Sequence, residues 1–390
     1  PTSQHHGSCQ YGEWEYNTES MMKDSKQQAS WQACSFIMEG KTFSMETYRK
    51  GLSSFPDNPY QELLQFLDEW FDESPTLRVF TSGSTGTPKE LLVRKEQMMN
   101  SARITCEALH LQKGDKALLC MPLRYIAGKM VVVRALVAGL ELIVREPSGH
   151  PLADVNEHLR FAAMIPLQVF NSLSVPQEAC RLEDTDILII GGGAIDKQLE
   201  TALRKMKNTI YSTYGMTETL SHIALRRLNG TEASERYTPF PSVSISLSAD
   251  HTLVIDAPQV CDETLVTNDV VELFPDGTFQ IIGRKDNIIN SGGIKIQTEC
   301  VEKTLRSIIS VNFALTAVPH PKFGEALVLL VEKDNEKKID PKELEEQVKS
   351  VLPKYQQPKQ ILWIEALPLT QTGKISRAEC RKLAAEHVHY

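Results

Sequence analysis

Between residues 116 and 212 the sequence alternates short apolar runs with longer segments in which apolar residues recur at helical spacing. The run Ile187-Leu188-Ile189-Ile190 is apolar at every position, which is typical of a strand buried on both faces. Strands that alternate with helices favour a parallel sheet covered by helices. We expect strands at 116–120, 141–144, 161–164, 186–190 and 208–212, and helices at 127–140, 153–159, 166–173 and 195–206.

Two other patterns follow: alternating runs that predict an antiparallel subdomain, and a last region that predicts a small α+β unit. We therefore predict an α/β protein. Residues 1–283 would form a large N-terminal domain, with helix-covered parallel sheets and a small β subdomain, and residues 284–390 a small mobile α+β C-terminal domain. Residues 9–50 show no readable pattern. The remaining expected elements are helices at 61–70, 95–110, 297–309 and 341–351, and strands at 77–80, 91–93, 243–247, 252–256, 270–274, 278–282, 312–318, 326–332 and 360–364.

Composition narrows the range of functions. The net charge of the 390 residues is −8, so no overall basic surface invites nucleic acid. No apolar run approaches the roughly 18 residues of a membrane span, and the polar start, Pro1 to Ser8, lacks the apolar core of a signal peptide. The eight cysteines are scattered without a Cys-x-x-Cys pair, which favours reduced thiols over a metal or disulfide framework. We therefore expect a cytoplasmic protein without a membrane span.

Residues 81–89, Thr81-Ser82-Gly83-Ser84-Thr85-Gly86-Thr87-Pro88-Lys89, follow a short predicted strand. Glycines let a backbone approach a ligand closely, and successive N–H groups and hydroxyls can point at one anion. With the added charge of the lysine, the natural ligand is a polyphosphate. This is not a Walker A loop, because Thr87 and Pro88 separate Gly86 from Lys89. The alternative is a Ser/Thr/Gly-rich surface connector.

Further motifs stand where predicted strands end. Gly191-Gly192-Gly193 follows the strand at 186–190, where open α/β sheets bind ligands. The run after the next strand contains Glu218, which is either an Mg²⁺ ligand or a helix N-terminal charge. Asp269 begins a strand and either accepts ribose hydroxyls or forms a turn. A turn-rich loop near the C-terminus carries Lys374, and each such loop alone is usually only an exposed charged segment.

Taken in this order, the motifs resemble the adenylate-forming superfamily of acyl- and aryl-CoA synthetases, firefly luciferase and peptide-synthetase adenylation domains. The resemblance covers about residues 78–378. Family members usually carry a longer region before the phosphate loop, and Asn268 replaces their more usual glycine. The matching segments are Thr81 to Lys89, Tyr214-Gly215-Met216-Thr217-Glu218, Asn268-Asp269, Gly283-Arg284-Lys285-Asp286 with Gly293-Ile294-Lys295 and Glu299, and Thr372-Gly373-Lys374.

The resemblance implies two half-reactions with ATP, Mg²⁺ and CoA. A carboxylate attacks the α-phosphate of Mg-ATP to give an acyl-adenylate, and a thiol, expected to be CoA, then displaces AMP. Positive charge is the main requirement of the first step, because two anions must meet there. The resemblance assigns the β- and γ-phosphates to Thr81, Ser82, Gly83, Ser84, Thr85, Gly86 and Lys89; the adenine and acyl pockets to Gly191, Gly192, Gly193, Ser212, Thr213, Tyr214 and Gly215; the α-phosphate and Mg²⁺ to Thr217 and Glu218; the ribose to Asp269 and Arg284; the bridge between carboxylate and α-phosphate to Lys374; the hinge to Asp286; and the thiol tunnel to Gly293.

The stretch from Tyr214 to His222 looks most like the o-succinylbenzoate–CoA ligases of menaquinone synthesis, which are also compact. We therefore expect a small-molecule carboxylic acid as substrate, o-succinylbenzoate in particular, and leave a homo-oligomer open. Alternatives are another aryl- or acyl-CoA ligase, a carrier-protein-loading adenylation enzyme, and a non-catalytic nucleotide-binding relative. The last of these predicts loss of Lys374 or Glu218, and both are present.

The predicted helix from Gly128 to Ala138 is apolar nearly all round, so it is expected to be buried. Arg134 lies inside it, and a buried arginine is costly unless it is paired or faces a polar pocket. o-Succinylbenzoate has a second, unreacted carboxylate, which a guanidinium can hold with two parallel hydrogen bonds. We expect Arg134 to bind this carboxylate, with Arg124 and Tyr125 as second choices. The alternative is a structural ion pair with a neighbouring acid.

Overall fold

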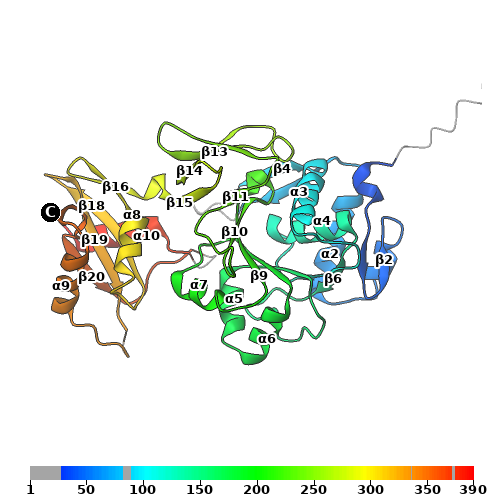
Figure 1. Ribbon diagram of the computed structural model, residues 1–390, viewed down its shortest axis with the longest axis horizontal. Helices are drawn as coiled ribbons and strands as arrows, with labels where there is room; N and C mark the ends of the chain where they lie inside the picture. Colours follow the sequence, from blue (N-terminus) through cyan, green and yellow to red (C-terminus); the bar gives the residue numbers. More distant parts are fainter. Residues whose placement is uncertain (1–27, 82–88, 335, 371–373) are drawn as a thin grey trace, which may run out of the picture.

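A computed structural model describes residues 28–81, 89–334, 336–370 and 374–390. In Figure 1 the chain forms a larger part, coloured from blue to yellow-green, with a smaller part beside it, coloured from yellow to red. Parallel strands and helices build the larger part, and a separate sheet with its own helices builds the smaller one. The predicted α/β fold class is confirmed. Among the described residues, no helix combines the length and the apolarity that crossing a membrane requires.

The larger part is built on a nine-stranded sheet in the order β11-β10-β9-β8-β7-β5-β6-β1-β2. Neighbouring strands from β9 through β1 run parallel, whereas β2, β10 and β11 join antiparallel at the edges. Strands β7 and β8 are buried at every position, which explains their continuous apolar sequences. The strands are β1 (Phe36–Met38), β2 (Lys41–Phe43), β5 (Lys116–Leu119), β6 (Glu141–Val144), β7 (Phe161–Met164), β8 (Ile187–Ile190), β9 (Thr209–Gly215), β10 (His222–Arg227) and β11 (Thr238–Pro239).

Helix α4 lies deep in the larger part, where it packs against α3 and against strands β5, β6 and β1. Every residue from Gly128 to Leu136 is buried, so the predicted burial of this helix is confirmed. Gly139 ends it in the left-handed conformation, with a φ of 68°. The helices of this part are α1 (Tyr48–Leu52), α2 (Asn58–Phe71), α3 (Lys95–Ala108), α4 (Ile126–Ala138), α5 (Pro166–Leu173), α6 (Pro176–Asp184) and α7 (Lys197–Leu203), with short 3₁₀ turns η1 (Ser30–Ala33) and η2 (Thr217–Thr219).

The helix predicted at 153–159 is wrong. Leu152, Val155 and Leu159 are buried at helical spacing, which explains the prediction. Two backbone carbonyls at the start of this segment accept hydrogen bonds from a side chain rather than from a helical N–H. Arg181 Nη1 donates to the carbonyl of Leu152 at 2.9 Å and to that of Ala153 at 2.6 Å. The segment therefore runs between β6 and β7 as turns and irregular chain.

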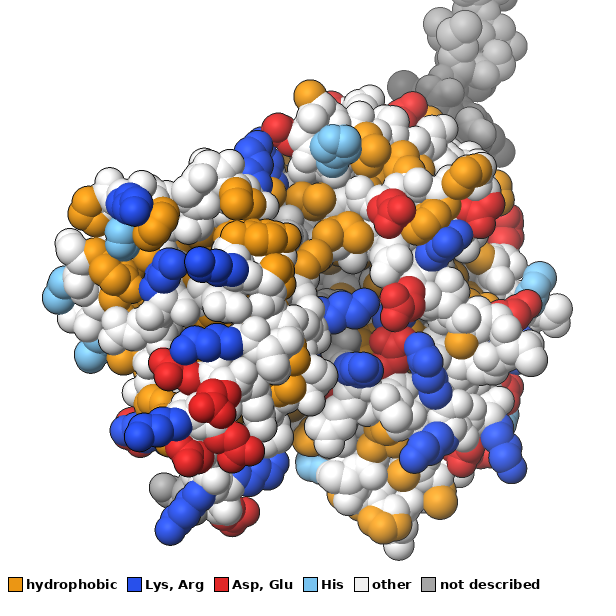
Figure 2. All heavy atoms as spheres, turned by 60° about the vertical axis from the view of Figure 1, so that its left-hand side comes forward, with side chains coloured by type: hydrophobic (Ala, Val, Ile, Leu, Met, Phe, Trp, Pro, Cys, Tyr) orange, Lys and Arg blue, Asp and Glu red, His pale blue; other side chains and the backbone are white. Residues whose placement is uncertain are grey.

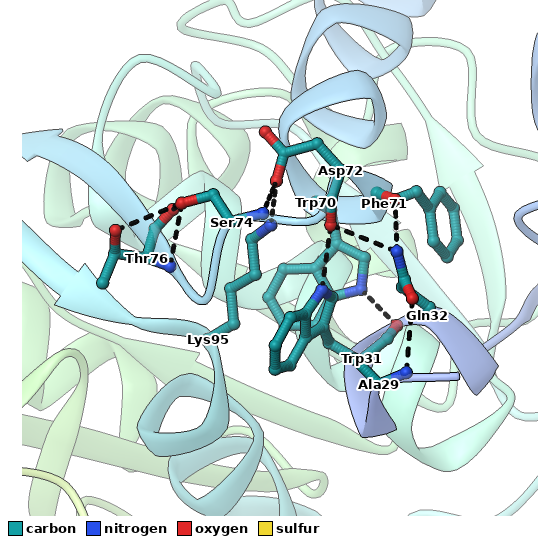
Figure 3. Close-up of polar contacts among 9 residues, drawn as sticks. All are labelled: Ala29, Trp31, Gln32, Trp70, Phe71, Asp72, Ser74, Thr76 and Lys95. Carbon is teal, nitrogen blue, oxygen red and sulfur yellow. Dashed lines mark hydrogen bonds and ion pairs between the residues drawn. The ribbon is translucent and has the colours of Figure 1, made fainter. Parts of the chain in front are cut away.

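The first described residues are fastened to the end of α2 (Figure 3). Trp31 Nε1 donates to the carbonyl of Asp72 at 3.1 Å, and Gln32 Nε2 donates to the carbonyl of Phe71 at 3.1 Å. The fully buried amine of Lys95 donates to Asp72 Oδ1 at 2.6 Å and lies over the Trp31 ring. Desolvation lowers the pKa of Lys95, and its bond to Asp72 opposes that shift. Side-chain contacts therefore hold a region that showed no readable sequence pattern.

Two further sheets complete the fold. Strands β12 to β15 form the predicted antiparallel sheet, and the chain leaves it through the turn η3 (Lys285–Asn287). Among the described residues that follow, a five-stranded sheet and its helices form the smaller part (Figure 1). These elements are β12 (Ser244–Leu247), β13 (Thr252–Asp256), β14 (Leu265–Leu273), β15 (Phe279–Arg284), β16 (Ile288–Ser291), β17 (Ile294–Gln297), α8 (Thr298–Leu305), β18 (Phe313–His320), β19 (Gly324–Glu332), α9 (Pro341–Val351), η4 (Lys354–Gln356), β20 (Gln360–Ile364) and α10 (Arg377–His387).

Candidate active site

A glycine-lined edge forms where β8 and β9 end side by side. A Cβ on Gly191 would lie 2.4 Å from Thr213 Oγ1, and Gly192 has a φ of 78°, which favours glycine. Gly215, at the end of β9, is equally confined, because a Cβ there would lie 2.3 Å from the carbonyl oxygen of Ser221. Backbone is therefore exposed at the carboxyl ends of two parallel strands, where open α/β sheets bind ligands.

Lys374 reaches this edge from the smaller part. Its Cε lies 3.7 Å from the position that a Cβ on Gly193 would take. The base of its loop is closed, because the N–H of Thr370 donates to the carbonyl of Lys374 at 2.6 Å. Desolvation and then the charge of Arg284 lower the pKa of Lys374, although the residue keeps a solvent-exposed surface. Figure 2 shows a hollow between the two parts of the molecule, with basic and acidic side chains beside it.

A chain of hydrogen bonds joins the predicted ribose residues. Tyr214 Oη donates to Asp269 Oδ2 at 2.5 Å, and Arg284 Nη1 donates to Asp269 Oδ1 at 3.0 Å. Arg284 Nη2 continues the chain to Asp286 Oδ2 at 3.3 Å. Burial and then the charge of Asp269 raise the pKa of Tyr214, so the phenol stays protonated. Each Asp269 oxygen keeps a second lone pair, which can accept a sugar hydroxyl.

Thr81 and Lys89 close the base of the predicted phosphate loop, between β3 (Thr76–Phe80) and β4 (Glu90–Arg94). The N–H of Thr81 donates to the carbonyl of Lys89 at 2.9 Å, and the N–H of Lys89 donates to Thr81 Oγ1 at 3.0 Å. Thr81 and Lys89 are therefore paired with each other at the end of the hairpin. The other predicted phosphate-binding residues, Ser82, Gly83, Ser84, Thr85 and Gly86, lie outside the described residues.

Glu218 and Thr217 lie in the turn η2, directly after the glycine-lined edge. The carboxylate of Glu218 is exposed. Within the described ranges, no three or more His, Cys, Asp or Glu side chains gather closely enough to hold a metal ion. One exposed carboxylate nevertheless fits Mg²⁺ in such a site, because Mg²⁺ is usually held by one or two carboxylates together with substrate phosphates.

Arg134 is 2% exposed within α4. Its Nη2 donates to Ser221 Oγ at 2.6 Å, while its Nε has no hydrogen-bond partner in the part of the chain that the structure describes. Burial lowers the pKa of Arg134 to about 10, so the guanidinium still carries its charge at neutral pH. None of the described acids forms an ion pair with it, and the structural alternative considered above therefore lacks a partner in these residues.

Sequence reasoning missed the residues around Arg134. His222 lies between two hydroxyls, with Nδ1 3.1 Å from Ser221 Oγ and Nε2 3.1 Å from Thr105 Oγ1. Burial and then the charge of Arg134 lower the pKa of His222 well below its ordinary value, so the imidazole is neutral. Ser221 and His222 end the stretch that looks most like the o-succinylbenzoate–CoA ligases, and that resemblance was a usable signal. Thr105 lies on α3, 117 residues from His222, and carried none.

Tyr125 and Arg124, the second choices for binding the unreacted carboxylate, have surroundings different from those of Arg134. Tyr125 forms an isolated parallel β-bridge with Phe80, the last residue of β3 before the predicted phosphate loop. Arg124 lies over the Tyr125 ring and lines a groove of about 540 Å³ together with Lys129. No hydrogen bond among the described residues links Arg124 to Arg134.

Two further predicted residues remain: Ser212, which pairs with Ile190 beside the glycine-lined edge, and Gly293, which lies apart from it. Ser212 is buried, and its Oγ lies 2.8 Å from the hydroxyl of Tyr237, a partner that sequence reasoning did not supply. Gly293, with a φ of 82°, is exposed in the turn between β16 and β17. Lys374 and Gly293 belong to the same small part of the molecule, and of these two only Lys374 lies against Gly193 here.

Two family models match the chain. Residues 18–261 match the model described as AMP-binding enzyme, and residues 301–374 match the AMP-binding enzyme C-terminal domain. A curated relative, the 2-succinylbenzoate–CoA ligase of Escherichia coli K12, is 27% identical over 314 residues, which cover 76% of this chain and 66% of that protein. The chain thus spans about two thirds of that relative's length.

Solved structures agree with this match. An acyl-CoA synthetase (AMP-forming)/AMP-acid ligase II-like protein from Dyadobacter fermentans is 33% identical, with a TM-score of 0.58, over 83% of this chain and 94% of that one. The o-succinylbenzoate CoA synthetase of Bacillus subtilis, solved with its acyl-adenylate intermediate, has a TM-score of 0.65 over 78% of this chain and 68% of that one. Its identity of 21% supports the shared fold alone.

Proposed function

From the premise that this chain belongs to the AMP-binding enzyme family, we propose that it is an AMP-forming ligase that joins 2-succinylbenzoate to CoA. In the first step a carboxylate oxygen of the acid attacks the α-phosphorus of ATP, and the bond to pyrophosphate breaks. In the second step the CoA sulfur attacks the acyl carbon, and the bond to AMP breaks. The relatives named 2-succinylbenzoate–CoA ligase support this choice of acid.

The first step brings the carboxylate of the acid and the α-phosphate of ATP together, and we propose that Lys374 supplies the positive charge between them. It lies against Gly193, at the edge where ATP would bind. A preorganised positive charge at this point would stabilise the developing negative charge of the transition state. Asp269, held by Tyr214 and Arg284, would accept the ribose hydroxyls and so fix the nucleotide.

The remaining predicted groups bind or neutralise phosphates. Thr81 and Lys89 hold the base of the loop proposed for the β- and γ-phosphates. Glu218, with Thr217, would hold Mg²⁺ at the α-phosphate, and the ion would supply positive charge there. Gly293 stays our candidate for a residue that lines the thiol tunnel.

We further propose that the protein is cytoplasmic. The described cysteines are free thiols, which supports this location.

One observation carries the choice of a diacid: Arg134 is a charged, buried guanidinium with an unpartnered Nε. A guanidinium can donate two parallel hydrogen bonds to a carboxylate. A charge left without a counter-ion in the interior is strongly unfavourable. An acid whose second carboxylate binds beside Arg134 would supply the partner that the described residues lack.

The test is AMP formation across a panel of carboxylic acids, with CoA as the thiol. For 2-succinylbenzoate and for a matched acid without the unreacted carboxylate, kcat/KM is compared in wild type, Arg134→Leu and Arg134→Lys. We expect Arg134→Leu to lose the diacid selectively by roughly 10²-fold or more, since one hydrogen-bonded charge pair is worth about 2–5 kcal/mol. Arg134→Lys should retain part of the preference.

Equal loss on both acids with a lowered Tm would show instead that Arg134 is structural. A wild type that ignores 2-succinylbenzoate but accepts another acid would reject the substrate and keep the reaction class. A thiol panel that includes a carrier protein separates CoA ligation from carrier loading, because both share the first step.

A further inference from the structure

Two side chains of the smaller part hold the last residue of β15, the strand that precedes it. Gln297 ends β17, and Glu299 lies in the first turn of α8, which packs against β15 (Figure 1). Gln297 Nε2 donates to the carbonyl of Arg284 at 2.9 Å, and the N–H of Arg284 donates to Glu299 Oε1 at 3.1 Å. Both backbone polar groups of Arg284 are therefore bonded to these two side chains, which we call the clamp.

The two side chains of the clamp also hold each other. Gln297 Nε2 donates to Glu299 Oε2 at 2.5 Å, and Asn287 Nδ2 donates to Glu299 Oε1 at 2.5 Å. The Glu299 carboxylate thus accepts three hydrogen bonds, and a bond to an ionised acceptor is stronger than one between neutral groups. Both clamp residues are half-buried, so their positions are restricted.

Gly283, directly before Arg284, leaves the space that the clamp occupies. A Cβ on Gly283 would lie 2.5 Å from Gln297 Nε2 and 2.5 Å from Glu299 Oε2. The φ of Gly283 is not positive, so its backbone conformation is open to other residues. The two clamp side chains, rather than the backbone, therefore require a glycine at this position.

The clamp spans the proposed hinge. Asp286 lies between Arg284 and the two clamp residues in the chain, so rotation at Asp286 would change the distances from Arg284 to both of them. Hydrogen bonds weaken steeply outside a narrow range of distance and angle. The clamp is closed in the arrangement of the two parts in which Lys374 lies against Gly193.

We propose that the clamp favours the arrangement that forms the adenylate, and that it opens before the thioester step. Gln297 and Glu299 are then positioning residues that act through Lys374 rather than on a substrate. Opening is reversible because Arg284 is exposed, so water can replace the lost bonds. Arg284 also bonds to Asp269, so the clamp joins the proposed ribose site to the smaller part. The inference rests on the proposed function, because it needs two half-reactions.

The first test measures the two half-reactions separately, in Gln297→Met and Glu299→Ala. A contact made in only one of two arrangements shifts their equilibrium by its own free energy. We therefore expect the ratio of the adenylate-forming rate to the rate of thioester formation from pre-made acyl-adenylate to fall by about 2- to 10-fold for each lost hydrogen bond. The thioester step itself should be unchanged or faster.

The control for the charge is Glu343→Ala, which removes an acid from the first turn of α9, where Gln347 of the same helix donates to it. It should leave the ratio unchanged. Equal slowing of both half-reactions in the clamp variants, or an unchanged ratio, would overturn the proposal.

Gly283→Ala is a second test that leaves both clamp residues in place. The added Cβ should push the ends of Gln297 and Glu299 away, because both ends are flexible side-chain atoms. We expect the same fall in the ratio of the two rates. A weakened ribose site would slow both steps instead, since ATP and the acyl-adenylate carry the same ribose, and that result would count against the clamp.

The arrangement itself is measured without substrates. Spin labels are coupled to a ketone-bearing amino acid introduced at Gln177 of α6 and at Glu346 of α9, two exposed positions in the larger and the smaller part. Double electron–electron resonance then gives the distribution of distances between them. We expect Gln297→Met, Glu299→Ala and Gly283→Ala each to move population away from the main wild-type distance. Distributions that superpose on the wild type in all three variants would refute the clamp.

The two proposals fail in different ways. A wild type that forms AMP with no acid of the panel rejects the proposed function, and the spin-label distances still decide whether the clamp holds the two parts. If the wild type ligates 2-succinylbenzoate to CoA while the clamp variants change neither the ratio of rates nor the distances, only the clamp is rejected.

Discussion

The surroundings of Lys374 disfavour its charged form. Desolvation and the neighbouring Arg284 both favour the neutral amine, and they lower the pKa of Lys374 from its ordinary value. A cation held beside another cation gains more when an anion arrives than one already paired. Within the described residues no carboxylate forms an ion pair with Lys374. The side chain is thus prepared for the anions of the first half-reaction.

Replacing Lys374 should therefore separate the two half-reactions. In Lys374→Ala we expect adenylate formation, measured by ATP–pyrophosphate exchange, to fall by about 10²–10³-fold, the typical loss for one electrostatic group. Thioester formation from pre-made acyl-adenylate should survive, because that step has no phosphate–carboxylate encounter. Adenylate formation at the normal rate would refute the role of Lys374.

His222 should leave a signature in the stability of the protein against pH. Its pKa in the folded state lies well below the ordinary 6.5. The unfolded chain binds the proton more readily, so the stabilisation is full above about pH 6.5 and is lost as the pH falls below it. His222→Gln should therefore show a smaller fall in Tm between about pH 7.5 and 5.5 than wild type.

His158 provides the control, because its shift has the opposite sign. Hydrogen bonds to Asp184 and Asp186 raise the pKa of this exposed histidine. Its contribution is present below about pH 6.5 and is lost as the pH rises through the raised value. His158→Gln should not reduce the loss on the acid side. Parallel Tm profiles for wild type and His222→Gln would contradict the buried neutral histidine.

Individual site residues could be predicted from the sequence where they belong to contiguous motifs. Gly191, Gly192, Asp269 and Arg284 were predicted, and the structure gives each of them a physical reason for its position. The link between Thr105 and His222 was not predictable, because it joins α3 to β10 through a single tertiary contact. Hydrogen-bond partners far apart in the chain leave no spacing pattern to read.

Among the elements, the β9–β10 connection depends most directly on one glycine. A Cβ on Gly215 would lie 2.3 Å from the carbonyl oxygen of Ser221 and 2.6 Å from the Cα of His222, and both are backbone atoms that cannot rotate away. The turn also contains Leu220 with a φ of 68°, which a branched-chain residue rarely adopts. This connection therefore has little freedom to adjust.

Gly215→Ala should consequently displace Ser221 and the start of β10 at His222. We expect a loss of about 1–3 kcal/mol in the free energy of unfolding, the usual cost of overpacking. Activity on the diacid should fall in the protein that remains folded. The measurement is Tm together with kcat/KM per folded enzyme, and an unchanged Tm with unchanged kinetics would contradict the tight approach.

Elements were predictable where burial sets the pattern. Strands β5 to β8 of the central sheet were predicted because residues buried on both faces must be apolar. The helix at 153–159 failed because Arg181 captures the carbonyls, a contact made by a side chain from α6. Strands β1 and β2, helix α1, helix α6 itself, strands β10 and β11, the β16–β17 hairpin and helix α10 were not predicted. The apolar residues of these elements pack against partners that come from distant parts of the sequence.

For the whole molecule, the decisive stretch is the connection between its two parts. Asp286 lies in the turn η3, and its carboxylate accepts from Arg284 Nη2 at 3.3 Å and from Asn268 Nδ2 at 3.4 Å. All three residues are polar and lie at the surface. An exposed turn whose bonds are made mostly by polar side chains can absorb rotation of one part against the other, because water can replace those bonds. This fits the hinge role that we propose for Asp286.

The hinge is tested by comparing two substitutions at Asp286. Asp286→Pro removes the carboxylate and fixes φ, whereas Asp286→Ala removes the carboxylate and leaves the backbone free. We expect Asp286→Pro to slow thioester formation far more than adenylate formation, and Asp286→Ala to affect both steps weakly. Equal loss of both half-reactions in the proline variant would count against a hinge.

The place of β1 in the central sheet also sets an order of events during synthesis. Ile37 pairs with Glu141 of β6, so β1 has no parallel neighbour until about a hundred further residues have been made. At about 5–20 residues per second, the ribosome needs several seconds or more for that stretch. Phe36, Met38 and Phe43, which end up almost fully buried, lack their final surroundings throughout this interval. Strands β1 and β2 therefore take their final place in the sheet only after β5 and β6 have been made, although they precede both in the sequence.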